Sequence, residues 1–274
     1  MVARRVRQLA GVEARIGALR YELLSSRFVG SDIEVGPGRQ PLLRIGDLTL
    51  ELSLLSAGGV LKVQRLEATG LQARLPGAWL ARAIALRPHR AALVRSGTVT
   101  GEVHLVGDAG TAVLSGVEIG VRDLELPEAA EGDRFHAGGQ VTLRARRLTL
   151  GRLTLERLLL EGRFRDSRLV IERVQAEVLG GKLDLHGRLG LTGARPGPLE
   201  LRGALTLRPG DGAPLVGKIR LSGRTLAALK LEGSLRGPSP APASGGLVPA
   251  PNVRVLLRLG RRQLQGTASS WQVR

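Results

Sequence analysis

The histidines are the side chains most able to act as general acids, bases or metal ligands near neutral pH. The chain has four of them, at positions far apart in the sequence, and no two have the short spacing of a zinc site. His104 and His186 alternate with apolar neighbours, so we expect both on the polar side of a strand. These residues are His89, His104, His136 and His186.

An acidic stretch is the second group that could do chemistry. It lacks the regular oxygen ligands and the central glycine of a calcium loop, so we interpret it as a charged loop between strands. The residues are Asp123, Glu125, Glu128, Glu131 and Asp133.

A partial phosphate-binding motif runs from Gly212 to Lys218 with the spacing G-x-x-x-x-G-K. Ile219 stands where a Ser or Thr would hold magnesium, and the residues that follow alternate like a strand. A phosphate loop requires a helix there, whose N-terminal amides face the phosphates. The chain also has no cysteine, which excludes thiolate chemistry. We therefore predict no catalytic, cofactor-binding or metal-binding residue, and no enzyme.

The charge of the chain is strongly unbalanced. Lys and Arg number 41 against 24 Asp and Glu, which gives a net charge of +17. Such a surface suits nucleic acid or the anionic surface of a membrane. Proteins that bind single strands on sheets stack bases on aromatic side chains, and aromatic residues make up only 2% of this chain. Nucleic-acid binding is therefore kept as an alternative, behind lipid.

The dominant pattern is the alternation of apolar and polar residues in short runs separated by glycine or charged residues. Alternation places apolar side chains on one face of a strand, so we predict an all-β chain of antiparallel strands. The short intervals leave no room for crossover helices between strands. The runs chosen as candidate apolar, lipid-facing positions are Leu48, Leu50, Leu52, Leu54, Val117, Ile119, Val121, Leu199, Leu201, Leu205 and Leu207.

One stretch breaks the alternation. From Leu148 to Leu160 the leucines recur with a five-residue period, so the apolar face changes parity at each repeat. A strand can keep one face buried through such a period only with a bulge or a turn, which we place at Gly151 and Arg157.

The expected organisation has five parts. Two short helices are predicted, over residues 3–15 and 78–87, the second stopped by Pro88. A region rich in Pro, Gly and Ser near the C-terminus indicates a linker. The parts are an N-terminal β unit with its leading helix (1–75), a helical connector (76–96), the main β-groove unit (97–236), the linker (237–252) and a C-terminal β segment (253–274).

No apolar stretch long enough to span a membrane is present, and none follows the basic start Met1-Val-Ala-Arg-Arg-Val-Arg. The sequence therefore predicts no signal peptide within the chain.

The N-terminal unit resembles the opening of AsmA-like envelope proteins, the superfamily that includes TamB. The resemblance is carried by Phe28-Val-Gly-Ser-Asp-Ile-Glu-Val, by Pro41-Leu-Leu-Arg-Ile-Gly-Asp-Leu-Thr-Leu-Glu-Leu, and by Leu61-Lys-Val-Gln-Arg-Leu-Glu-Ala-Thr-Gly-Leu. A second stretch, Gly180-Gly-Lys-Leu-Asp-Leu-His-Gly, is similar to the C-terminal strand pair of that family. The main unit also resembles the short N-type protein of type II secretion.

This resemblance implies a sheet curled into an elongated groove, apolar inside and polar outside, in a periplasmic protein associated with the inner membrane. It implies a role in lipid transport or outer-membrane biogenesis, with phospholipid or another envelope lipid, an anionic membrane surface and other envelope or secretion proteins as partners. The alternatives are a structural component of a secretion system and a basic nucleic-acid-binding β protein. No cofactor is expected.

The alternation alone fits a closed sandwich as well as an open groove. For an open groove, the Leu201→Asp variant is expected to lose lipid uptake and stay folded. In a sandwich the same charge would be sealed in a core.

Overall fold

Strands account for nearly the whole of the described chain. The computed structural model describes residues 14–36, 41–53, 60–76, 91–107, 110–126, 137–150, 153–165, 168–178, 180–192, 195–208, 214–223, 230–236, 255–259, 262–267 and 270–273. Among these residues there is no helix, and hence none with the length and apolarity needed to cross a membrane. The strands are β1 (Ala14–Glu22), β2 (Arg27–Val35), β3 (Leu43–Leu52), β4 (Leu61–Pro76), β5 (Ala92–Gly107), β6 (Gly110–Leu126), β7 (Gly138–Leu150), β8 (Leu153–Arg165), β9 (Arg168–Val178), β10 (Gly181–Thr192), β11 (Arg195–Leu207), β12 (Leu215–Gly223), β13 (Lys230–Arg236), β14 (Val255–Leu259), β15 (Arg262–Thr267) and β16 (Ser270–Val273).

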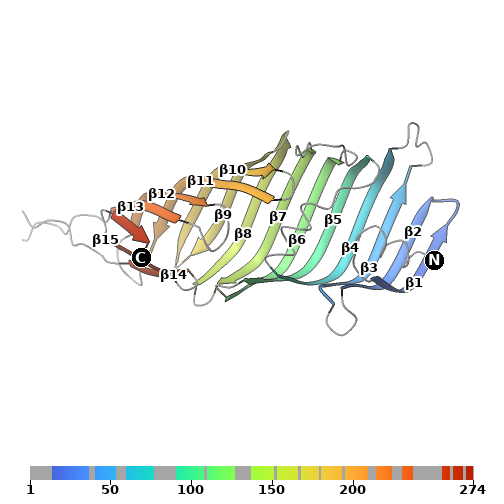
Figure 1. The fold of residues 1–274 in the computed structure, drawn as a ribbon, viewed down its shortest axis with the longest axis horizontal. Helices are drawn as coiled ribbons and strands as arrows, with labels where there is room; N and C mark the ends of the chain where they lie inside the picture. Colours follow the sequence, from blue (N-terminus) through green and yellow to red (C-terminus); the bar gives the residue numbers. More distant parts are fainter. Residues whose placement is uncertain are drawn as a thin grey trace, which may run out of the picture.

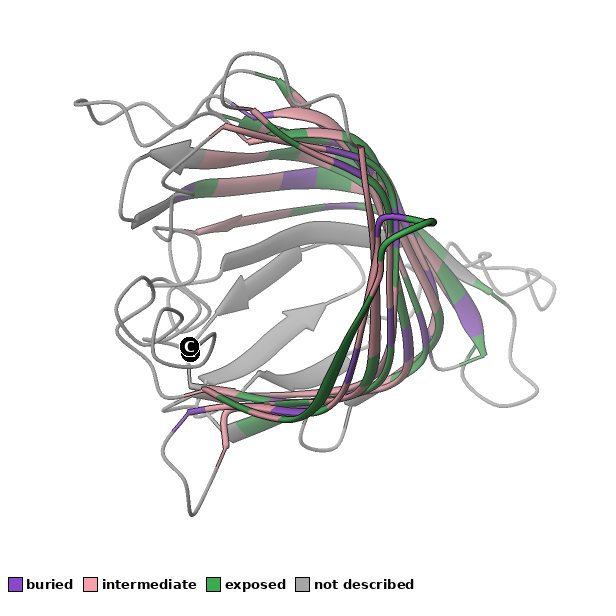
Figure 2. Cartoon of the chain, turned by 90° about the vertical axis from the view of Figure 1, so that its right-hand side faces the viewer, coloured by how far each residue is buried: buried purple, intermediate pink, exposed green. Residues whose placement is uncertain are grey.

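Thirteen strands form one sheet in which each strand pairs with its neighbours in the sequence, from β1 to β13. Figure 1 shows these strands side by side in chain order along the long axis of the molecule. Viewed along that axis, the strands bend into an open arc (Figure 2). The sheet is thus a curled, elongated groove, as predicted, and not a pair of facing sheets. The remaining strands, β14 to β16, form a small sheet that contacts the large one chiefly at β13.

The pair β4 and β5 differs from the expectation of antiparallel hairpins throughout. These two strands are parallel, with Leu61 opposite Ala92 and Pro76 opposite Val106. A parallel pair needs a return connection of a dozen residues or more, and the chain between them, residues 77–91, has that length.

The predicted helices are corrected where the structure describes them. Residues 14 and 15, the end of the expected helix 3–15, belong to β1, because Ala14 and Ile16 pair with Val35 and Ile33 of β2. Residues 92–96 of the expected connector 76–96 belong to β5, and Pro76 belongs to β4. Residues 3–13 of the first expected helix, the whole of the second (78–87) and the whole linker 237–252 lie outside the described residues.

The five-residue leucine period is interrupted by a strand end and a bulge, as the sequence predicted. β7 ends at Leu150 and β8 begins at Leu153, and these two residues face each other across the strand pair. Within β8, Arg157 has a φ of 51°, and the register with β9 shifts between Glu156 and Leu159. The bulge returns the apolar residues that follow it to the same face as Leu155.

Two further bulges restore the apolar face in the same way. In β4 the buried face passes from an even position, Ala68, to an odd position, Leu71, and Gly70 between them has a φ of 66°. In β6 the buried face passes in the same way from Leu114 to Val117, and Gly116 between them has a φ of 62°. These positions favour glycine because a Cβ is strained at positive φ.

The bulge at Arg157 predicts that valine, which usually favours β-strands, destabilises the protein at this position. Arg157→Val should lower the free energy of unfolding by about 1–2 kcal/mol, because a β-branched residue is strained in the left-handed region. Arg157→Gly should leave it unchanged or raise it slightly, since the exposed ion pair to Glu177 that it removes contributes little. Denaturant unfolding of both variants measures the difference, and a more stable valine variant would contradict the bulge.

Candidate functional site: an apolar stripe along the groove

Two neighbouring rows of side chains cross the sheet in register from β1 to β12, and we call them together the apolar stripe. Every residue in both rows is apolar or glycine, and each lies directly opposite the next across a strand pair. The first row is Leu19, Gly30, Leu48, Ala68, Val99, Ile119, Leu143, Leu160, Val174, Leu185, Gly203 and Ile219. The second row is Tyr21, Phe28, Leu50, Leu66, Gly97, Val121, Val141, Gly162, Ile171, Gly187, Leu201 and Leu221.

The stripe is long for a surface of one polarity. Neighbouring strands lie about 4.8 Å apart, so twelve strands give a run of roughly 50 Å. This length exceeds the roughly 30 Å hydrocarbon core of a bilayer. An acyl chain lying along the stripe would therefore meet apolar side chains over its whole length.

The side chains of the stripe are most exposed at β1, and apart from Ala68 in β4 the buried ones lie in β9 to β12. At β1, Leu19 is 48% exposed and Tyr21 is 42% exposed. The middle positions, such as Leu48 and Ile119, are half-buried. At the other end Leu185 is only 3% exposed. The groove is therefore open at β1 and filled by its own side chains near β12.

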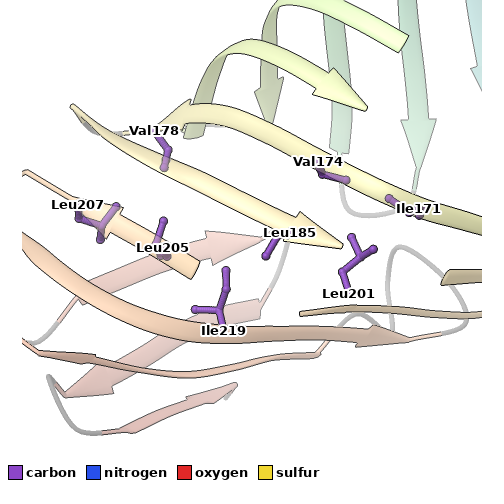
Figure 3. Close-up of a cluster of buried hydrophobic side chains, with 8 residues drawn as sticks. All are labelled: Ile171, Val174, Val178, Leu185, Leu201, Leu205, Leu207 and Ile219. Atoms are coloured by element: carbon purple, nitrogen blue, oxygen red, sulfur yellow. The ribbon is translucent and has the colours of Figure 1, made fainter. Parts of the chain in front are cut away.

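The filled end is a cluster of buried side chains from β9 to β12. Figure 3 shows them on one side of the curled strands, with Leu185, Leu201 and Ile219 pointing toward a shared space. A second, smaller cluster packs Leu114, Val117 and Ala145 in the middle of the sheet. Curling brings neighbouring side chains together, and burial of apolar area supplies about 25 cal/mol per Å².

Ten of the eleven apolar positions chosen from the sequence lie within the described residues, and all ten lie on this one face. Those in the stripe itself come from three distant parts of the chain. Leu205, Leu207 and Val117 lie beside the stripe and are buried. Leu54 lies outside the described residues. The stripe members among the chosen residues are Leu48, Leu50, Ile119, Val121 and Leu201, while Leu52 and Leu199 flank it.

The structure changes the outcome expected for Leu201→Asp. Leu201 is 7% exposed and packs within the β9–β12 cluster, so a charge there would be buried even though the sheet is an open groove. Half-buried stripe positions such as Leu50 and Ile119 are the better places to test ligand binding.

Sequence reasoning selected stripe positions only in β3, β6 and β11, and it missed those of β1, β2, β5 and β12. It also missed those of β4 and of β7 to β10, including Leu66, Leu143, Leu160, Val174 and Leu185. The parity changes at the bulges hid them, because each of these strands except β10 carries apolar residues on both odd and even positions. They would have been found by a search for runs in which the alternation of apolar and polar residues continues after a shift of one residue.

The opposite face of the sheet carries the charges, mostly as cross-strand ion pairs. Arg27 lies 3.1 Å from Glu51, and Arg95 lies 3.0 Å from Asp123. Within β4, Arg65 donates a hydrogen bond to Glu67, and this bond raises the pKa of the arginine. Exposed pairs of this kind contribute little to stability, so their main effect is a wet, soluble outer face.

The residues considered first for chemistry lie apart on this polar face. His104 contacts Glu102 at 2.5 Å, whereas the exposed His186 lies five strands away in β10. Asp123 and Glu125 belong to β6 and not to a loop, which corrects that expectation for these two residues. Lys218 lies in β12, so the partial phosphate motif leads into a strand. The described residues contain no group of three or more acidic or histidine side chains arranged to hold a metal.

A hollow of about 1280 Å³ on the polar face lies beside the parallel pair β4 and β5. Its lining mixes cations, carboxylates and hydroxyl groups, among them Arg74, Thr100, Glu102 and Arg146. His104, which contacts Glu102, and Thr111 also line this hollow, but no hydrogen bond joins a threonine hydroxyl to His104 among the described residues, as an activated hydroxyl nucleophile would need.

Aromatic side chains are absent from the polar face within the described part of the chain. Tyr21 and Phe28 pack together on the apolar face, with ring centroids 4.4 Å apart. No family model, no curated protein and no solved structure matches this chain.

Proposed function

We propose that this protein is a non-enzymatic carrier surface for lipid, which holds acyl chains along the apolar stripe and contributes to lipid transport or outer-membrane assembly in the cell envelope. The observation that carries the proposal is the stripe itself, two rows of apolar side chains in register through twelve strands. Burying each methylene of an acyl chain there contributes about 0.8 kcal/mol.

The uneven exposure of the stripe supports an entry point at β1. Leu19 and Tyr21 leave apolar area open to solvent at that end, whereas the β9–β12 cluster fills the other. A lipid therefore gains most by lying over β1 to β8. This architecture agrees with the AsmA-like resemblance, and the proposed location is the periplasm beside the inner membrane.

A secretion-system component built on the same kind of groove is the second candidate. The position of β1 at the edge of the described sheet favours it, because an edge strand can pair with a strand of another protein. Nucleic-acid binding is third, since no aromatic residue lies on the polar face within the described residues.

Lipid transfer is the direct test. Wild-type protein should accelerate movement of a fluorescent phospholipid between vesicles, and Leu50→Asp should reduce this rate roughly tenfold or more, because an acyl chain cannot lie against an unpaired carboxylate without a large desolvation cost. Leu50 is half-buried between Phe28 and Leu66.

The matched control is Thr98→Asp, which adds the same charge at an exposed position on the other face of the sheet. It should transfer lipid like the wild type, and both variants should unfold cooperatively. Failure of the wild type to bind or transfer lipid would reject the carrier role and favour the secretion-system candidate.

A further inference from the structure

The positive charge of the polar face is concentrated at one end of the sheet. From β1 to β9 the described side chains include 17 Lys and Arg against 14 Asp and Glu, which is close to balance. From β10 to β12 they include six Lys and Arg against only two Asp and Glu. The excess is therefore densest on three adjacent strands, which carry four excess positive charges against three on the nine strands before them.

Both carboxylates of this region already have partners. Glu200 lies 2.8 Å from Arg188, and Asp184 accepts a hydrogen bond of 3.0 Å from Gln175. The other cations are exposed and have no ion pair with any side chain that the structure describes in β1 to β12. We call these five residues the basic patch: Lys182, Arg202, Arg208, Lys218 and Arg220.

The register sets like charges against each other within the patch. Arg202 lies directly opposite Arg220, whose other cross-strand neighbour in the backbone register is Glu232 of β13. Like charges in directly opposite positions destabilise a sheet. Many arginines of this face lie opposite carboxylates, as Arg188 does with Glu200, and the Arg202–Arg220 pair lacks this compensation between its two strands. An anionic partner would relieve this repulsion.

We propose that the polar face of β10–β12 docks on an anionic lipid bilayer through the basic patch. The charge is complementary to the surface of such a bilayer, where each nearby Lys or Arg raises the affinity about fivefold. A bilayer is favoured over nucleic acid because no aromatic side chain for base stacking lies on this face within the described residues.

Docking at this face also determines which end of the groove lies near the membrane. The patch lies at the end of the sheet where the stripe is filled, and the open end at β1 lies about ten strands away. The molecule would then hold its filled end at one membrane and present its open end away from it. This inference goes beyond the carrier role, because docking needs only the outer face and not a lipid in the groove.

Vesicle co-sedimentation with matched variants tests the proposal. The Arg202→Gln/Arg220→Gln double variant removes two cations of the basic patch. The control variant, Arg74→Gln/Arg122→Gln, removes two exposed arginines from β4 and β6, which also have no ion-pair partner among the described residues. Both lose the same net charge. Wild type and control should bind vesicles of phosphatidylcholine with phosphatidylglycerol equally, the patch variant roughly 30-fold more weakly, and none should bind phosphatidylcholine alone. Added salt should reduce binding.

A label gives a second readout that does not depend on removing charge. The chain has no cysteine, so Ala204→Cys and Thr98→Cys each carry a single polarity-sensitive fluorophore. Ala204 is exposed and lies opposite Lys218, within the patch, whereas Thr98 is exposed on β5. Anionic vesicles with a quencher lipid should quench the label at 204 and leave that at 98 unchanged.

Three results would overturn the proposal. Equal weakening of both double variants would mean that net charge alone binds the vesicles. Equal quenching at both labels would mean that no particular face docks. Tight binding of an oligonucleotide, lost in the patch variant, with no binding to anionic vesicles would assign the patch to nucleic acid. None of these results depends on whether the groove transfers lipid.

Discussion

The Leu201→Asp variant should lose most of its stability and unfold at or near room temperature. Leu201 is 7% exposed and packs in the β9–β12 cluster, with no cation beside it on that face. A carboxylate buried without a partner costs several kcal/mol, which is comparable to the whole stability of an ordinary domain. Thermal melting and circular dichroism measure the loss.

The adjacent residue supplies the matched control. Arg202→Asp places the same side chain one position along β11, on the exposed polar face beside Arg220. It should fold as well as the wild type or slightly better, because it replaces a repulsion between two arginines by an attraction. If both variants behave alike, the assignment of opposite faces to residues 201 and 202 is incorrect.

Gly203→Ala should be the second most damaging of the changes considered, although it adds only a methyl group to an apolar face. A Cβ at Gly203 would lie 1.9 Å from the carbonyl oxygen of Asp184 and 2.9 Å from the Cα of Leu185. Both atoms belong to the backbone of β10, so they can move only if the strand pair separates. We expect a loss of about 2 kcal/mol or more, measured by denaturant unfolding.

Gly120→Ala is the control for this prediction. Its Cβ would meet nothing closer than the Cβ of Thr142 at 3.8 Å, an ordinary contact. Replacing a strand glycine that has room for a side chain usually stabilises a protein by about 0.4–1 kcal/mol, because the unfolded chain loses freedom. A Gly203→Ala variant as stable as Gly120→Ala would show that β10 and β11 do not approach as closely as the structure indicates.

The sequence predicted the class of fold because alternation is a local property. The run from Leu199 to Leu207 alternates without interruption and forms β11 as expected. The leucine period ending at Leu160 also identified a strand end and a bulge, because a two-residue period cannot otherwise keep one face buried.

The sequence did not predict the apolar stripe, because the stripe depends on register between strands far apart in the chain. Leu50, Val121 and Leu201 share one row only through the pairing of all the intervening strands. The parallel pair β4 and β5 was missed for a related reason. A long connection permits either direction of return, and local residues do not distinguish the two.

The basic patch was likewise not visible as a site. The sequence shows 17 excess positive charges, but which arginines face carboxylates depends on cross-strand partners. Register neutralises Arg188 through Glu200 and leaves Arg202 facing Arg220.

Site-specific photo-crosslinking in living cells tests most directly whether the apolar stripe carries lipid. A photoreactive amino acid is placed in turn at Leu48, Ile119 and Leu160, three half-buried members of one row, and at exposed Thr98 on the opposite face. Mass spectrometry then identifies what each position captured. The lipid-carrier account predicts lipid adducts at all three stripe positions and none at Thr98. No lipid at the stripe, or equal capture at Thr98, would contradict it.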